Sequence, residues 1–172
     1  MNNIILILGI IFSIVSLATF LFKDKFIILT WFLIANVIIL IQYLLTDCIV
    51  ECLIVAASII KTVVFMIYAK LQIKPNLYVV IIFEVLMLVC GIIVWSSWFS
   101  LLFLIASMIS TYASWQDDLL LMKILYAISS VFYIINYICT GLYTNIIAEV
   151  GIMLSAIIGI IIYDVNKRKT KV

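Results

Sequence analysis

Three ionisable side chains lie deep inside apolar runs of this chain, where a charge is costly and therefore calls for an explanation. Lys61 and Glu84 fall about 12 and 10 Å from the same end of their runs at 1.5 Å per residue. We predict that they form a buried charge pair, which either fastens two helices together or handles a proton or an anion. Glu149 lies about 9 Å from the opposite end of the last run, where a carboxylate suits cation binding or proton coupling.

Uncharged polar residues recur at helical spacing in the same runs. Asn36 and Tyr43 are seven residues apart and share one helical face, and the sixth run carries a stripe that includes Tyr133, Asn136 and Tyr137. Lipid offers no hydrogen-bond partners, so these side chains are expected to face inward, either to line a solute path or to hold helices together. The predicted path comprises Asn36, Tyr43, Tyr133, Asn136, Tyr137 and Glu149.

Residue types that many active sites require are scarce. The chain has no His, five Gly and one Pro, which removes imidazole metal sites, His-dependent triads and glycine-rich phosphate loops. The four Cys form no C-x-x-C motif, and Cys48 and Cys52, on one helical face, are expected to be packing residues rather than a disulfide. We therefore predict no metal, no cofactor and no enzymatic activity.

The elements that position these residues are membrane-spanning helices. Hydrophobic residues make up 69% of the chain and charged residues 10%, against about 45–50% and 25% in globular domains. The apolar runs match the roughly 20 residues that cross a bilayer as a helix, and none alternates like a barrel strand. We predict an all-α integral membrane protein, one transmembrane domain over residues 1–172, with spans Asn3–Phe22, Phe26–Thr46, Ile49–Ala69, Leu77–Trp95, Phe99–Gln116, Leu119–Thr140 and Tyr143–Tyr163.

The basic residues outside the spans predict the orientation. With seven spans, one side of the membrane holds Lys23, Lys25, Lys70, Lys74, Lys167, Arg168, Lys169 and Lys171, and the other side holds none. Lys and Arg concentrate in cytoplasmic loops. The N-terminus is therefore predicted to lie outside and the C-terminus in the cytoplasm.

The chain also repeats itself at a distance of 94 residues. This shift aligns the first three spans with the last three and matches several polar positions: Ser13 with Ser107, Ser16 with Ser110, Asp24 with Asp118, Tyr43 with Tyr137 and Thr46 with Thr140. Three spans invert the chain, and a single intervening span restores its direction. We predict a 3+1+3 arrangement of two parallel triple-helix repeats, with residues 1–70 and 97–172 as the repeats and 71–96 as the linker.

The 3+1+3 plan resembles the superfamily of SWEET sugar facilitators, PQ-loop transporters and PnuC-type permeases (MtN3-like). More closely, the chain resembles the YgjV family of bacterial inner-membrane proteins through "SIVSLATFLFKDK" (Ser13–Lys25), "ASIIKTVVF" (Ala57–Phe65), "SWQDD" (Ser114–Asp118) and "YIINYICTGLYTNIIAE" (Tyr133–Glu149). The resemblance implies a fold rather than an activity. SWEET and PQ-loop proteins carry a Pro in the first helix of each triplet, whereas the sole Pro here is Pro75, in a connection, which makes a SWEET-like sugar facilitator less favoured.

These observations favour a small-solute transporter or facilitator of the bacterial inner membrane, a multi-pass protein with a polar path between the repeats. The alternative is a membrane sensor, an immunity protein or a complex scaffold that transports nothing. The expected partners are the lipid bilayer and a small-molecule substrate, with a homo-oligomer possible and nucleic acid excluded.

Overall fold

The structure is a computed structural model that describes residues 2–46, 49–93, 98–141 and 143–165. The described residues form seven α-helices and no strand: α1 (Asn2–Ala18), α2 (Lys25–Leu45), α3 (Ile49–Leu71), α4 (Leu77–Ile93), α5 (Trp98–Trp115), α6 (Leu119–Thr140) and α7 (Tyr143–Gly159). A 3₁₀ turn (Thr19–Leu21) extends α1, and a π-helical turn (Ile160–Val165) extends α7. The predicted all-α class is confirmed.

Six of these helices, all except α4, are long and apolar enough to cross a membrane. Helix α4 has 17 described residues, about 26 Å at 1.5 Å per residue. The predicted end of this span, Trp95, lies outside the described residues, as does Cys48. None of the described cysteines, Cys52, Cys90 and Cys139, forms a disulfide.

Two aspartates set the starts of α2 and α6 in the same way. The Asp24 carboxylate accepts a hydrogen bond from the Phe26 amide at 2.7 Å, and the Asp118 carboxylate accepts one from the Leu120 amide at 2.9 Å. Each satisfies a backbone N–H group that a helix start leaves without an intrahelical partner. The two helices therefore begin at positions 94 residues apart for the same local reason.

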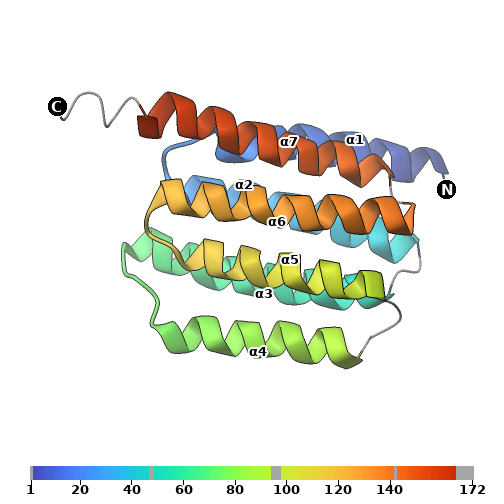
Figure 1. The fold of residues 1–172 in the computed structure, drawn as a ribbon, viewed down its shortest axis with the longest axis horizontal. Coiled ribbons are helices and arrows are strands. Elements are labelled where there is room, and N and C mark those ends of the chain that lie inside the picture. The colour runs from blue at the N-terminus through green and yellow to red at the C-terminus, as the bar shows by residue number, and fades with distance from the viewer. Residues whose placement is uncertain (1, 47–48, 94–97, 142, 166–172) are drawn as a thin grey trace.

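The helices pack in two rows of three, with α4 at one edge (Figure 1). One row holds α1, α2 and α3, and the other holds α5, α6 and α7, with the middle helix of each row packed against its two neighbours. The rows meet where α1 packs on α7 and α3 packs on α5, while α4 contacts both α3 and α5. Side chains of α2 and α6 meet between the rows.

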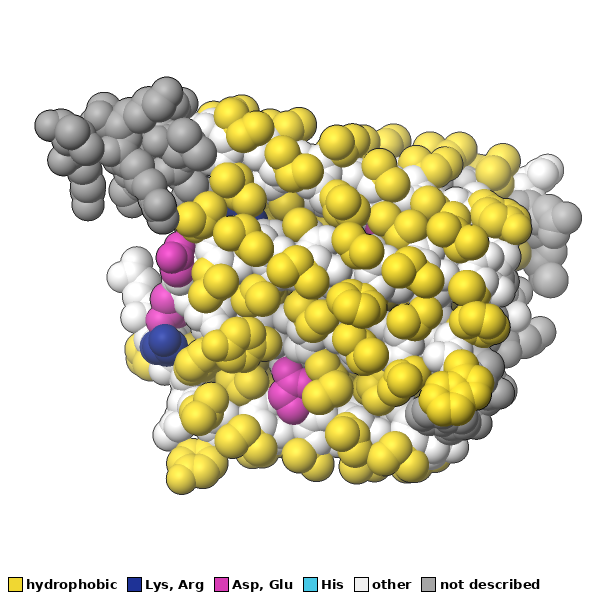
Figure 2. All heavy atoms as spheres, in the orientation of Figure 1, with side chains coloured by type: hydrophobic (Ala, Val, Ile, Leu, Met, Phe, Trp, Pro, Cys, Tyr) yellow, Lys and Arg dark blue, Asp and Glu magenta, His cyan; other side chains and the backbone are white. Residues whose placement is uncertain are grey.

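The face of the molecule seen in Figure 2 is largely hydrophobic along the helices. Large apolar side chains are exposed on every helix, and α4 has the densest set, including Ile82 and Ile93 at 63% and 74% exposure. Exposure of this kind on every described helix is typical of helices that face hydrocarbon rather than water. The outer side chains of the helices therefore contact lipid, whereas those of a globular domain contact water.

Candidate functional site

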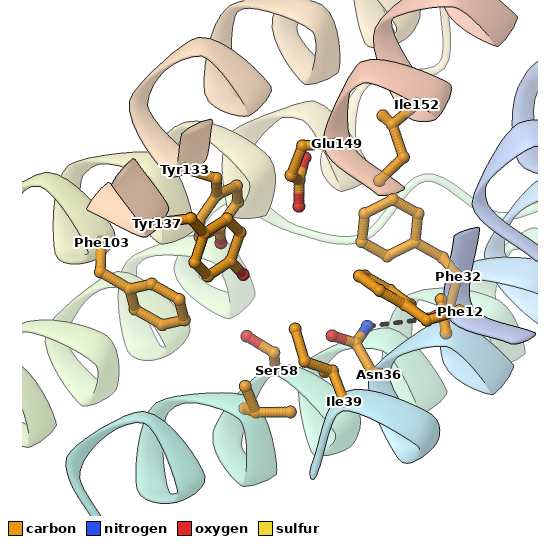
Figure 3. Close-up of a pocket in the computed structure, with 12 residues that line it drawn as sticks. Phe12, Phe32, Asn36, Ile39, Ser58, Phe103, Tyr133, Tyr137, Glu149 and Ile152 are labelled. Carbon is orange, nitrogen blue, oxygen red and sulfur yellow. Dashed lines mark hydrogen bonds between the residues drawn. The ribbon is translucent and has the colours of Figure 1, made fainter. Parts of the chain in front are cut away.

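A small cavity lies between the two rows, bounded by α1, α2, α3, α5, α6 and α7 (Figure 3). Its volume is about 40 Å³, which is room for roughly two or three water molecules. Its polar lining residues are Asn36, Ser58, Tyr133, Tyr137 and Glu149. The apolar lining residues are Phe12, Phe32, Ala35, Ile39, Val55, Phe103 and Ile152.

The cavity lies where the 94-residue shift relates one wall to the other. Three pairs of positions separated by 94 residues both line it: Val55 with Glu149, Ile39 with Tyr133, and Ser58 with Ile152. In each pair one member is apolar and the other is polar. Equivalent positions of the two halves thus line the same cavity, but one side chain of each pair is polar and the other is apolar.

Glu149 is the charged element of the cavity. Its side chain is only 5% exposed, and Figure 3 shows the carboxylate directed from α7 into the cavity. Oε2 has no hydrogen-bond partner among the described residues, while the Ser130 hydroxyl lies close enough to interact with the group. The ion pairs found in the described ranges do not include Glu149. A buried carboxylate without a cation is costly, which is typical of a functional position.

Asn36 presents a hydrogen-bond acceptor to the same space. Its Nδ2 group donates to the Phe32 carbonyl oxygen one turn earlier on α2, at 2.9 Å. Figure 3 shows that Oδ1 is consequently turned toward the cavity, across from Glu149. The amide is thus oriented by the helix to which it belongs.

One end of the cavity is closed by tyrosines. The Tyr43 hydroxyl donates to the Tyr137 hydroxyl at 3.2 Å, so two positions 94 residues apart touch each other. The Tyr133 ring stacks on the Tyr137 ring with centroids 6.2 Å apart, and the Tyr133 hydroxyl is hydrogen-bonded to Ser107 at 3.0 Å. Tyr43 and Tyr137 are fully buried, which makes this end a packed closure.

The opposite end is closed by a second aromatic pair. Phe32 and Tyr126, again 94 residues apart, lie with ring centroids 4.6 Å apart, and Phe20 packs on both. The Tyr126 hydroxyl is hydrogen-bonded to Ser114. On α2 the two closures are eleven residues apart, which is about 16 Å along the helix.

Of the six residues predicted to form the path, four line the cavity: Asn36, Tyr133, Tyr137 and Glu149. Tyr43 lies behind the lining as the partner of Tyr137. Asn136 does not line the cavity, because one residue along a helix is a rotation of 100°, and it points to α5. There its Nδ2 group donates to the Phe99 carbonyl oxygen at 2.8 Å.

The predicted charge pair of Lys61 and Glu84 is not a direct ion pair in the structure. Lys61 is 1% exposed, and its Nζ donates to the hydroxyls of Ser110 and Thr111 on α5, at 3.2 and 3.3 Å. Glu84, on α4, lies close enough for its charge to interact with Lys61, yet its Oε2 has no hydrogen-bond partner among the described residues. The ammonium group prefers α5 because the two hydroxyls lie within its reach.

A cluster of charges at the lysine-rich end of the molecule was not predicted. Asp117, between α5 and α6, pairs with Lys25 at 3.4 Å and with Lys74 at 3.6 Å. Lys74 also lies 4.4 Å from the centre of the Trp115 ring, whose Nε1 donates to the Pro75 carbonyl oxygen. These contacts tie the start of α2 to the α3–α4 and α5–α6 connections. The sequence signal for this cluster is the "SWQDD" segment (Ser114–Asp118), whose acidic residues lie on the lysine-rich side of the predicted topology.

A model of a bacterial inner-membrane protein family, Imp-YgjV, matches residues 3–167 of the chain. The chain belongs to the Imp-YgjV family. With its long apolar helices, this Imp-YgjV protein is a multi-pass protein of the bacterial inner membrane. No curated protein and no solved structure matches the chain.

Proposed function

We propose that this Imp-YgjV protein is a small-solute transporter or facilitator, with a path that runs through the cavity between its two rows of helices. The observation that carries the proposal is the buried cavity into which Glu149 and Asn36 direct oxygen atoms. A helix bundle that serves only as a scaffold gains nothing from an unpaired carboxylate in a water-sized space, because both features destabilise it. Transport requires such a site near the middle of the membrane.

The proposal includes a 3+1+3 arrangement, with α1–α3 and α5–α7 as parallel triple-helix repeats and α4 as the linker, as in the SWEET, PQ-loop and PnuC-like superfamily. Helix α3 begins at Ile49 and α7 at Tyr143, 94 residues apart, as α2 and α6 do. Contacts between equivalent residues, Tyr43 with Tyr137 and Phe32 with Tyr126, are expected on an axis that relates two repeats. A path along that axis would cross the membrane.

The two aromatic closures suit alternating access. Each joins α2 of one proposed repeat to α6 of the other, so rocking of the repeats opens one closure while the other stays packed. We further propose that the lysine-rich end is cytoplasmic, because basic residues concentrate on that side. Asp117 with Lys25 and Lys74 would then strengthen the cytoplasmic closure.

Uptake into proteoliposomes tests the proposal. The wild-type protein should accumulate at least one member of a panel of small neutral and cationic solutes with saturable kinetics. We expect Asn36→Ala and Glu149→Gln to lower that flux at least tenfold, because each removes an oxygen that faces the cavity. Val150→Ala is the matched control, since Val150 adjoins Glu149 on α7 but is 41% exposed on the outer surface. Equal and negligible flux for all four proteins would favour the sensor, immunity or scaffold alternative.

A further inference from the structure

We propose that the cavity binds a compact protonated amine, with Glu149 as its counter-ion. As the substrate class of the transport path, this inference rests on the proposed function, but binding can be measured without transport. Three independent properties of the cavity select such a ligand: its charge, its hydrogen-bonding groups and its aromatic walls.

The charge of the cavity selects a cation. Glu149 brings a carboxylate that is 95% buried, by its 5% exposure, with Oε2 unpartnered among the described residues. None of the twelve lining residues is a Lys or an Arg. The buried lysine of α3, Lys61, is engaged with the α5 hydroxyls of Ser110 and Thr111. The carboxylate therefore has no cation beside it among the lining residues. A positively charged ligand can supply one, whereas an anion would be repelled.

The hydrogen-bonding groups select a cation that carries N–H bonds. Asn36 Nδ2 donates to the Phe32 carbonyl oxygen, which turns the amide nitrogen away and the amide oxygen toward the cavity. Glu149 likewise offers oxygen acceptors when ionised. A primary or secondary ammonium group can donate to both residues, whereas a quaternary ammonium group has no N–H and would leave these acceptors unsatisfied.

The walls select a small organic ion rather than a hydrated metal ion. The rings of Phe12, Phe32, Phe103, Tyr133 and Tyr137 all line the cavity. Aromatic faces attract cations, and ammonium groups are the usual ligands of such cages. A metal ion would need several oxygen ligands, and the described residues contain no group of three or more His, Cys, Asp or Glu side chains that could hold one. The volume of about 40 Å³ limits the amine to a few heavy atoms.

Equilibrium dialysis of the purified full-length protein in detergent, with radiolabelled methylammonium as the probe, tests the inference. We expect saturable binding that unlabelled ethylammonium competes away and that tetramethylammonium and acetate do not. Glu149→Gln should weaken binding at least tenfold, while the Val150→Ala control binds as the wild type does. Size-exclusion profiles and unfolding midpoints establish that each variant is folded, and Glu149→Asp, which keeps the charge, should retain measurable binding if Glu149→Gln does not fold.

The outcomes separate this inference from the proposed function. Absence of saturable methylammonium binding, equal binding by folded Glu149→Gln, or equal competition by tetramethylammonium would overturn the inference. Uptake of a neutral solute without amine binding would overturn it and leave transport standing. Amine binding that depends on Glu149, without flux of any solute in proteoliposomes, would support the inference and overturn transport.

Discussion

The two interfaces that join the rows of helices occupy corresponding positions and are built differently. Where α1 packs on α7, glycines allow backbones to approach: a Cβ atom at Gly159 would collide with the Phe20 carbonyl oxygen, and one at Gly151 would lie 3.1 Å from the Leu17 side chain. At the positions 94 residues earlier, where α3 faces α5, the chain carries Phe65 and Ala57. The interface of α1 with α7 is accordingly the more extensive.

This difference indicates which interface can open. Backbone that packs directly on backbone has no side chains that can change rotamer, so α1 and α7 are expected to move together. Between α3 and α5 the contact is made by side chains such as Lys61 with Ser110, and α4 covers it from outside. In the proposed transport cycle we therefore expect the α3–α5 contact to rearrange, while the α1–α7 interface stays packed.

The largest effect is expected when the side chains at the equivalent positions 55 and 149 are exchanged. Glu149→Val should lower amine binding and flux at least tenfold, because it removes the one charged side chain among the described residues that line the cavity. Adding Val55→Glu should restore a measurable part of both, since Val55 lines the same cavity from α3. Binding and flux of the single and double variants are compared with those of the wild type. A folded double variant that recovers nothing would show that the two positions are not interchangeable.

A smaller effect, on stability, is expected at the α1–α7 interface. Gly159→Ala places a methyl group against the Phe20 backbone and should lower the free energy of unfolding by about 1–3 kcal/mol. Gly151→Ala is the matched control, because the neighbouring Leu17 side chain can shift aside. Unfolding midpoints in one detergent give the comparison. Equal midpoints for the two variants would contradict the close packing of backbones.

The smallest effect is expected at Lys61. Lys61→Met removes a buried ammonium group whose nearest partners are neutral hydroxyls, and each of these already donates to the Ser107 carbonyl oxygen. The free energy of unfolding should therefore stay the same or rise by about 1 kcal/mol, which the midpoint of unfolding measures. Glu84→Gln should change little. A marked loss of stability in both variants would instead indicate a working charge pair between α3 and α4.

Much of the helical framework was predictable because its signals are local. The predicted starts of α3, α4, α6 and α7 agree with the structure, and α2 begins one residue earlier than expected. Apolar length defines a membrane helix, and Asp24 and Asp118 mark two helix starts through contacts two residues away. The first span ends in a 3₁₀ turn that the hydrophobic pattern does not reveal.

The site was predictable in part. The side chains of Asn36, Tyr133, Tyr137 and Glu149 were expected to face inward because lipid cannot satisfy them, and they do line a cavity. The same reasoning assigned Asn136 to the path, whereas its side chain donates to a backbone carbonyl oxygen of α5, because a neighbouring helix can also satisfy a polar side chain. The prediction also paired Lys61 with Glu84 because the two residues lie at similar depth in their spans. Depth does not show that the hydroxyls of Ser110 and Thr111 lie within reach of Lys61.

The sequence by itself determined the class of the protein, the number and register of its helices and the 94-residue correspondence between its halves, because hydrophobic length, capping and repetition are properties of the chain. Only the tertiary structure decided which equivalent residues meet, that Phe32 touches Tyr126 and Tyr43 touches Tyr137, and that Glu149 is left without a cation between them. Those facts depend on the rotation and separation of helices distant in sequence, which packing sets and local pattern does not.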